Sequence, residues 1–230
     1  MFKPILFLTF VALIQAVAVL ENDLIQTISE LLENPGRSVT CEIEAHRFST
    51  CLKNVFEKIR NKRDASAVPS KAEVFAKVAA IRSSLQCVGE PKCNRLKVAK
   101  YMLDSLVYSL EHAFGRGYEC IDEKRNQQDL IHCTISSLLS EKSVEDIQNE
   151  MENNLNDILE RLGKPIAKCV STKSQCAAHA KNEFYKGSVA FADLYSLFLQ
   201  VQRSLQSWEP ILVDTFDKKF NPNVYNELIL

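Results

Sequence analysis

The chain has 230 residues, of which 46% are hydrophobic and 25% are charged, and its formal net charge is −1 at pH 7. This near balance of basic and acidic residues, without a long run of either sign, argues against binding to nucleic acid or to an anionic membrane. Six glycines and seven prolines are few for a loop-built protein. The composition therefore indicates a helix-rich globular chain of the all-α class.

The N-terminus has the pattern of a secretory signal peptide over residues 1–18. A short basic start, Met1–Lys3, precedes an apolar stretch over 4–15, and Ala16-Val17-Ala18 forms an A-x-A cleavage site. The alternative is a membrane anchor, but this apolar run is shorter than the roughly 20 residues that a bilayer span needs. We therefore expect a secreted, extracellular protein whose mature chain has no membrane span.

Apolar periodicity predicts four helices in the first half of the chain. The first covers 20–33 and the second about 41–60. Ser70 and Glu73 have the spacing of a capping box and open the third helix, whose apolar stripe is Val74, Val78, Ile81 and Leu85. A long fourth helix follows Pro91, ends at Gly115 and Gly117, and carries Leu96, Ala99, Leu103, Leu106, Leu110 and Ala113.

Three further helices are predicted in the second half. One spans about 120–140, the next begins at Ser143 and ends at Gly163 and Pro165, and the last follows Cys176. No convincing alternation of period two occurs, so no sheet is expected. The expected organisation is an N-terminal helix with a linker, a cysteine-rich helical domain and a tail, over 19–37, 38–207 and 208–230.

Eight cysteines, an even number in an exported chain, predict disulfides at Cys41, Cys51, Cys87, Cys93, Cys120, Cys133, Cys169 and Cys176. Zinc is disfavoured because the closest pairs are C-x₅-C and C-x₆-C rather than short hooks. The spacing is C-x₉-C-x₃₅-C-x₅-C and then C-x₁₂-C-x₃₅-C-x₆-C. This repetition suggests two similar three-helix halves, over 38–117 and 118–207.

Helix geometry limits how these cysteines can pair. Cys41 and Cys51 lie about 15 Å apart along one helix, whereas a disulfide needs Cα atoms within about 7 Å. Cys120 and Cys133 are further apart still. Each of these four must therefore pair with a cysteine on another element. The nearest candidates are the cysteines at the two turns between helices, namely Cys87 and Cys93 at one turn and Cys169 and Cys176 at the other. The individual partners stay open at this point.

Five segments carry the cysteines in a helical context: VTCEIEAHRFSTCLKNVFEKI (39–59), SLQCVGEPKCNRLK (84–97), EHAFGRGYECIDEK (111–124), DLIHCTISSLL (129–139) and AKCVSTKSQCAAHAK (167–181). Taken in this order, they resemble the nematode secreted cysteine-rich family catalogued as domain of unknown function nineteen. The resemblance covers about 39–186 and rests on cysteine spacing in a helical context. Family members carry further cysteines where this chain has Ala79–Ile81, Tyr101–Met102 and Glu183–Gly187. The resemblance implies a secreted, helical, disulfide-bonded domain, and supplies no activity or catalytic residues.

No pattern of catalytic residues is found. None of the four histidines, His46, His112, His132 and His179, has a metal-site spacing, and the chain lacks a nucleophile elbow and a phosphate-binding loop. Bridged cysteines are not nucleophiles. We therefore expect no enzymatic activity, no metal and no cofactor.

Two features admit a functional interpretation. The last long helix carries an apolar stripe, which indicates core packing, a cavity for an apolar small molecule, or a face for a partner; its residues are Phe191, Leu194, Phe198, Val201, Leu205 and Trp208. The second feature is a basic stretch with Arg60, Lys62 and Arg63, which is either a solvated loop or a processing site cut after Arg63.

The leading hypothesis is a secreted, non-enzymatic module that binds an extracellular protein. The alternative is a carrier of an apolar small ligand in a helical cavity, and a weaker one is a secreted factor processed after Arg63.

Overall fold

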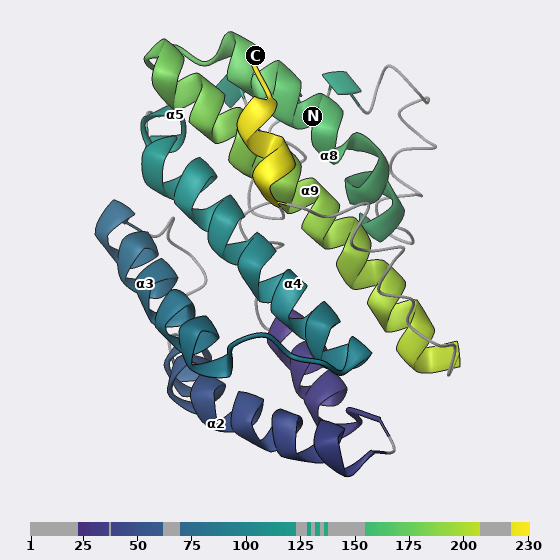
Figure 1. Cartoon of the computed structure of the whole chain (residues 1–230). Coiled ribbons are helices and arrows are strands. Elements are labelled where there is room, and N and C mark those ends of the chain that lie inside the picture. Colours follow the sequence, from purple (N-terminus) through teal and green to yellow (C-terminus); the bar gives the residue numbers. More distant parts are fainter. Residues whose placement is uncertain are drawn as a thin grey trace.

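A computed structural model describes residues 23–36, 38–61, 70–122, 128–129, 132–133, 136–137, 155–207 and 222–230. Every regular element in these ranges is a helix (Figure 1), which confirms the predicted all-α class. A helix over 23–33 precedes the labelled elements. These are α2 (Val39–Asn61), α3 (Lys71–Val88), α4 (Asn94–Ser109), η1 (Leu110–Arg116), α5 (Glu119–Asp122), α8 (Leu155–Lys173), α9 (Ala178–Ser207) and η2 (Pro222–Glu227).

The third predicted helix forms as its local sequence requires. The Ser70 hydroxyl accepts a hydrogen bond from the backbone N–H of Glu73 at 3.3 Å, and the Glu73 carboxylate accepts one from the Ser70 N–H at 2.9 Å. This reciprocal capping box begins α3, and Gly89, with φ of +72°, ends it in a backbone conformation that favours glycine. All four residues of the predicted stripe are buried.

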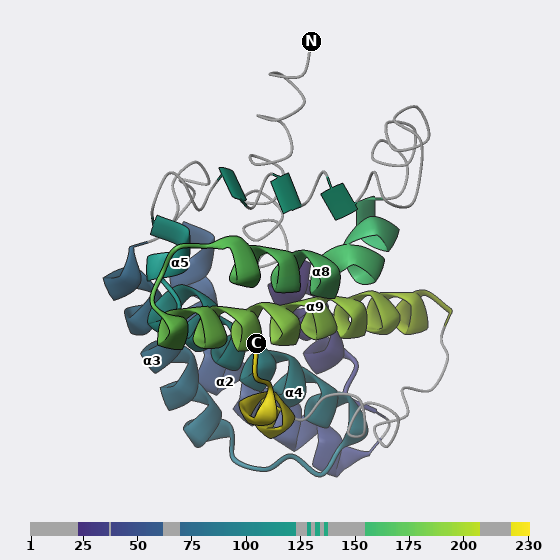
Figure 2. The same ribbon diagram turned by 90° about the horizontal axis from the view of Figure 1, so that it is seen from above.

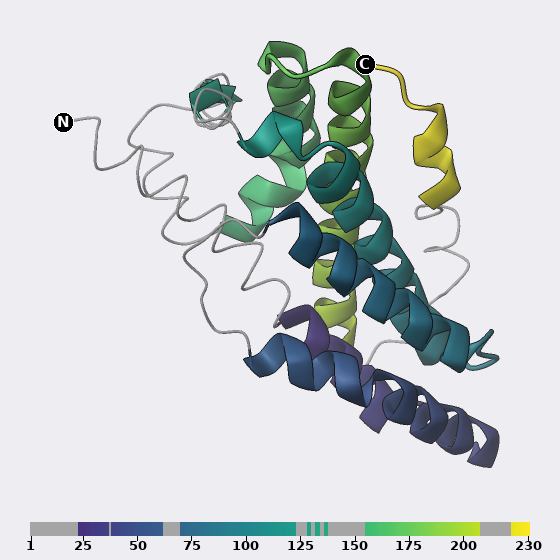
Figure 3. The same cartoon turned by 90° about the vertical axis from the view of Figure 1, so that its left-hand side faces the viewer.

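The helices pack in the order α2, α3, α4, α9 and α8 across the molecule. α3, α4 and α9 run roughly alongside one another, and α2 lies across one end of α3 and α4 (Figures 1 and 3). α9 contacts α4 on one side and α8 on the other, where the two form a hairpin (Figure 2). α4 and α9 therefore join the two halves of the chain.

Two apolar cores result from this packing. The main core draws side chains from residues 23–33, α2, α3, α4 and α9, so the last helix completes the interior of the first half. A smaller core lies between η1, α8 and the beginning of α9, and it contains Cys120 and Cys133 together with Leu162, Ile166, Val170 and Phe184.

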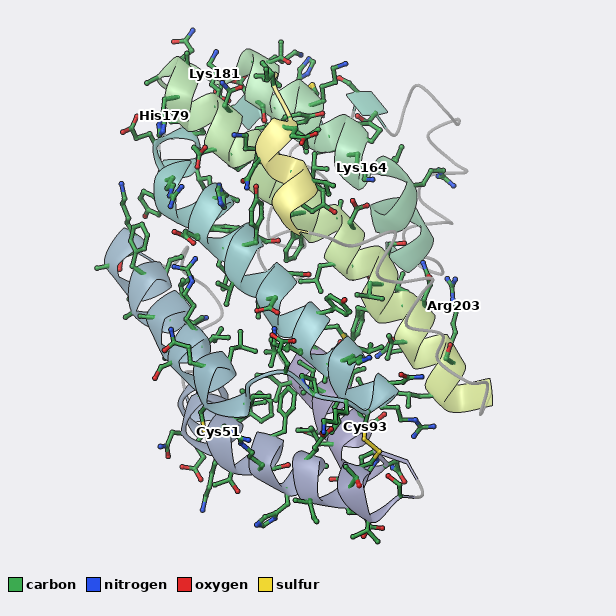
Figure 4. All side chains as sticks on the ribbon, in the orientation of Figure 1. Cys51, Cys93, Lys164, His179, Lys181 and Arg203 are labelled. Carbon is green, nitrogen blue, oxygen red and sulfur yellow. A yellow bond between two sulfur atoms is a disulfide. The ribbon has the colours of Figure 1, made fainter. Side chains whose placement is uncertain are left out.

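All eight cysteines form disulfides, and the bonds are nested in the same way in each half. Cys41 bonds Cys93 and Cys51 bonds Cys87, with Cα–Cα distances of 5.7 and 5.8 Å (Figure 4). In the second half Cys120 bonds Cys176 and Cys133 bonds Cys169, at 5.2 and 5.7 Å. Neither Cys41–Cys51 nor Cys120–Cys133 is a pair, as helix geometry required. Loops of this length give each bridge about 4 kcal/mol in the chain-entropy model.

The sixth predicted helix extends further toward the C-terminus than the sequence indicated. Its expected end at Gly163 and Pro165 is wrong, because α8 continues to Lys173 with Pro165 inside it. Beyond the proline, Ile166 and Val170 are buried in the smaller core, and Cys169 is held by its bridge. This tertiary packing outweighs the local helix-breaking tendency of proline. The predicted start at Ser143 lies outside the described residues.

The helix predicted over about 120–140 is described only in part. α5 covers Glu119–Asp122, and residues 128–129, 132–133 and 136–137 are helical. The long helix that follows Pro91 also differs from its prediction, because its last part, η1, is a π-helix. Its predicted apolar stripe from Leu96 to Ala113 is nevertheless buried throughout.

Candidate functional site

A cluster of charged side chains lies buried where η1 crosses α9. Glu111 and His112 on η1 and Glu183 on α9 are 8%, 7% and 7% exposed. Charged groups are rarely buried to this extent unless they are paired. We call Glu111, His112, Arg116 and Glu183 the polar cluster.

Each carboxylate of the polar cluster has cationic or histidine partners. Glu111 pairs with Arg82 of α3 and, at 2.9 Å, with Arg116. His112 Nδ1 lies 2.8 Å from the Glu183 carboxylate, and Arg116 lies 3.6 Å from the same carboxylate. The cluster thus connects α3, η1 and α9 through buried carboxylates, while the Arg82 and Arg116 side chains that pair with them are about half exposed to solvent.

Two glycines allow the backbones of η1 and α9 to meet at this crossing. A Cβ on Gly187 would lie 2.3 Å from the backbone nitrogen of Ala113, and one on Gly117 would lie 2.6 Å from that of Phe184. No side chain fits at either distance. The Gly117 N–H donates to the His112 carbonyl at 2.8 Å, which closes the wide turn of the π-helix.

Burial lowers the pKa of His112, although the carboxylate of Glu183 opposes this effect. The imidazole is therefore neutral at pH 7, and its Nδ1–H donates to Glu183. The ring of Tyr108 stacks on the imidazole with centroids 4.0 Å apart. Burial, aided by the charge of Glu183, raises the pKa of Tyr108 to about 12, so this phenol remains a donor.

A histidine–carboxylate pair can orient a general base, which acts on a hydroxyl, a water molecule or a substrate proton. The two nearest hydroxyls along the chain are used elsewhere. Ser109 donates to the Ser105 carbonyl at 2.8 Å, and Tyr108 donates to Asn226 at 2.9 Å. The His112–Glu183 pair connects η1 and α9 through a buried contact.

The apolar stripe of the last helix is part of the main core. Leu194, Phe198 and Val201 are 0%, 3% and 0% exposed, and Phe191 and Leu205 pack against the same core while partly buried. The three buried side chains are therefore not an exposed face for a partner, and core packing is the interpretation that matches their positions. Trp208 lies outside the described residues.

The residues of the possible processing site and the three other histidines, for which no site was predicted, are spread over the molecule. Arg60 is in the last turn of α2, and Lys62 and Arg63 lie outside the described residues. His46, His132 and His179 are exposed. Within the described part of the chain, no group of three histidine, cysteine or carboxylate side chains could hold a metal ion.

The C-terminal segment, residues 222–230, packs on the surface formed by α4 and α9, a feature that sequence reasoning missed. η2 lies against both helices (Figures 1 and 2). Tyr225 is only 5% exposed, and its hydroxyl donates to Asp193 at 2.6 Å. The only sequence signal is Pro222, which suits the first position of a helix.

A pair of apolar side chains is exposed at the beginning of α2. Val39 and Ile43, one helical turn apart in α2, are 70% and 66% exposed. Cys41, between them in the sequence, is bonded to Cys93. The carboxylate of Glu44 also accepts hydrogen bonds from the backbone N–H groups of Lys92 and Cys93, so this part of α2 is firmly held.

No protein-family model matches the chain, and comparisons with curated proteins and with solved structures found no match. The described helices include none that is both long enough and apolar enough to cross a membrane. The four disulfides are consistent with an extracellular protein.

Proposed function

We propose that the protein is a secreted, non-enzymatic module that binds another extracellular protein through the beginning of α2. Disulfides form and persist in oxidising compartments, and the leader over 1–18 predicts export. The resemblance to the nematode secreted family remains a prediction that agrees with this localisation.

The observation that carries the proposal is the exposure of Val39 and Ile43 on a rigid base. Large apolar side chains presented by a fixed element lose little conformational freedom on binding, which favours an interface. Both project from the segment held by the Cys41–Cys93 bridge and by the two hydrogen bonds to Glu44.

The test is capture of partners from extracellular material by the immobilised protein. The double change Val39→Glu and Ile43→Glu is expected to abolish capture of a partner that the unchanged protein binds. A matched control is Thr50→Glu with Asn54→Glu, which places two charges at the same spacing on exposed positions of α2. The proposed α2 interface would be refuted if both double variants lost capture equally. It would also be refuted if neither variant lost capture.

Secretion is tested separately by expressing the full chain in a eukaryotic secretory system. The expected product in the medium begins at residue 19 and has no free thiols. Retention inside the cell with residues 1–18 still attached would contradict the proposed export.

No observation favours the two alternatives. The stripe that a carrier would use to line a cavity is largely occupied by packing in the main core. The basic stretch that a processing enzyme would cut lies mostly outside the described residues.

A further inference from the structure

The C-terminal segment contacts α4 and α9 through a few specific side chains. Tyr225 enters the main core, while its neighbour Val224 and the later Ile229 are 52% and 84% exposed. The segment therefore presents some side chains to the helices and others to solvent. We call Tyr108, Asn182 and Asp193 the tail-binding surface.

Asp193 recognises the tyrosine through an oriented carboxylate. One of its oxygens accepts from the Tyr225 hydroxyl at 2.6 Å, and the other lies 2.6 Å from the ammonium of Lys164. Lys164 reaches this position from α8, beside η2 (Figure 4). Burial and the hydrogen bond to Asp193 raise the pKa of Tyr225 well above its usual range, which keeps the phenol a donor.

The remaining contacts recognise the residues that follow the tyrosine. Tyr108 donates to the Asn226 side-chain oxygen at 2.9 Å and packs against the ring of Tyr225 with centroids 5.7 Å apart. Tyr108 is itself positioned by stacking on His112. The backbone N–H of Leu230 donates to the Asn182 side chain at 3.1 Å.

We propose that the tail-binding surface is a binding site for tyrosine-containing peptide segments, and that the chain's own C-terminal segment occupies it as an intramolecular ligand. The contacts need a phenol, an amide side chain directly after it, and a free backbone N–H four residues further on. A covalent tether gives a ligand an effective concentration on the order of millimolar. A free peptide at micromolar concentration therefore competes poorly until the tail is weakened. The proposal does not depend on Val39 and Ile43.

The experiment uses the full chain and a fluorescein-labelled synthetic peptide of residues 220–230, followed by fluorescence anisotropy. The Tyr225→Ala protein is expected to bind this peptide saturably, with an affinity at least about tenfold higher than that of the unchanged protein, because its own tail has lost the phenol. Val224→Ala is the matched control, since this exposed tail residue leaves the Tyr225 contacts in place, and it should behave as the unchanged protein.

Two further changes test the recognition chemistry. A peptide with phenylalanine in place of the tyrosine is expected to bind the Tyr225→Ala protein about tenfold more weakly, because a hydrogen bond to a charged group is lost. The protein with Tyr225→Ala and Asp193→Asn should show a similar loss for the tyrosine peptide.

The proposal fails if a Tyr225→Ala protein with the circular dichroism spectrum of the unchanged protein does not bind the peptide. It also fails if the tyrosine and phenylalanine peptides bind equally well. Should Tyr225→Ala not fold, the variant with Tyr225→Phe and Asn226→Ala keeps the buried ring while removing two tail hydrogen bonds. It must then bind the peptide more tightly than the unchanged protein does, or the proposal is wrong.

Discussion

The two halves of the chain have the same arrangement of disulfides but place these bonds in different surroundings. The inner bridges, Cys51–Cys87 and Cys133–Cys169, both span a sequence separation of 36. In the first half Cys87 is exposed and the helices share a large apolar core. In the second half Cys133 is 0% exposed and belongs to a small core that contains another cysteine, Cys120.

The difference shows that a disulfide of the same loop length can stabilise the protein in two ways. In the first half the inner bridge, with its exposed Cys87, mainly restricts the unfolded chain, and of the four cysteines there only Cys93 of the outer bridge is buried in the main core. In the second half the inner bridge includes the fully buried Cys133, so it contributes packing as well as a cross-link.

The largest expected effect comes from removing the buried inner bridge. Replacing both Cys133 and Cys169 by alanine should lower the free energy of unfolding by the roughly 4 kcal/mol of the chain-entropy model, plus about 1 kcal/mol or more for the lost buried sulfur contacts. Guanidinium unfolding without reductant measures this loss.

The matched control is the replacement of both Cys51 and Cys87 by alanine, which opens a loop of the same length. The outer bridges left in each variant have similar separations of 52 and 56, so their residual constraint nearly cancels. Equal losses in the two variants would show that the buried sulfur atoms add nothing.

The next effect concerns the contact between the halves. Gly187→Ala should lower the free energy of unfolding by about 2–3 kcal/mol, because its Cβ would meet the backbone nitrogen of Ala113 on η1. Gly163→Ala should cost less, since there the Cβ would meet only the Ala192 side chain at 2.9 Å, within the α8–α9 hairpin. Thermal unfolding of both variants ranks them, and a milder effect at Gly187 would contradict the close approach of η1 and α9.

A pH-dependent effect is expected from His112. Its pKa is lowered in the folded state, so the unfolded chain binds a proton first as the pH falls below about 6.5. The free energy of unfolding should therefore decrease from pH 7 toward pH 5, with a slope of at most about 1.4 kcal/mol per pH unit. Tyr108 stacks on the ring, and the charges that act on it are those of Glu183, Arg116 and Glu111. Arg82 pairs with Glu111, and Lys186 pairs with Glu183.

His112→Gln should flatten this slope, and the same replacement at the exposed His46 is the matched control for the substitution itself. Urea unfolding at several pH values provides the slopes. An unchanged slope in the His112→Gln protein would mean that other groups account for the acid sensitivity.

The smallest expected effect is local to the first half. Ser70→Ala removes one side of the capping box and should lower the free energy of unfolding by about 1 kcal/mol. Hydrogen exchange should show faster opening of the first turn of α3 and unchanged protection in α9. Loss of protection in both α3 and α9 would indicate that the two halves of the chain unfold together as one cooperative unit.

Local sequence determined much of the architecture. The all-α class, the capping box at Ser70 and the buried stripes of α3 and α4 follow from side-chain periodicity and from hydrogen bonds between residues a few positions apart. The rule that cysteines on one helix must find partners elsewhere also follows from the sequence, because the rise per residue of a helix is constant.

Only the tertiary structure determined which cysteines pair. It also explains why α8 continues through Pro165 and why η1 forms a π-helix where it packs against α9. It also brought Glu183 to His112 and Tyr225 to Asp193, residues that lie 71 and 32 positions apart. The physical reason is the range of the interactions: capping and periodicity act within one or two helical turns. A buried charge pair or a docked tail, by contrast, depends on where separate helices cross, and that is set by packing of the whole core.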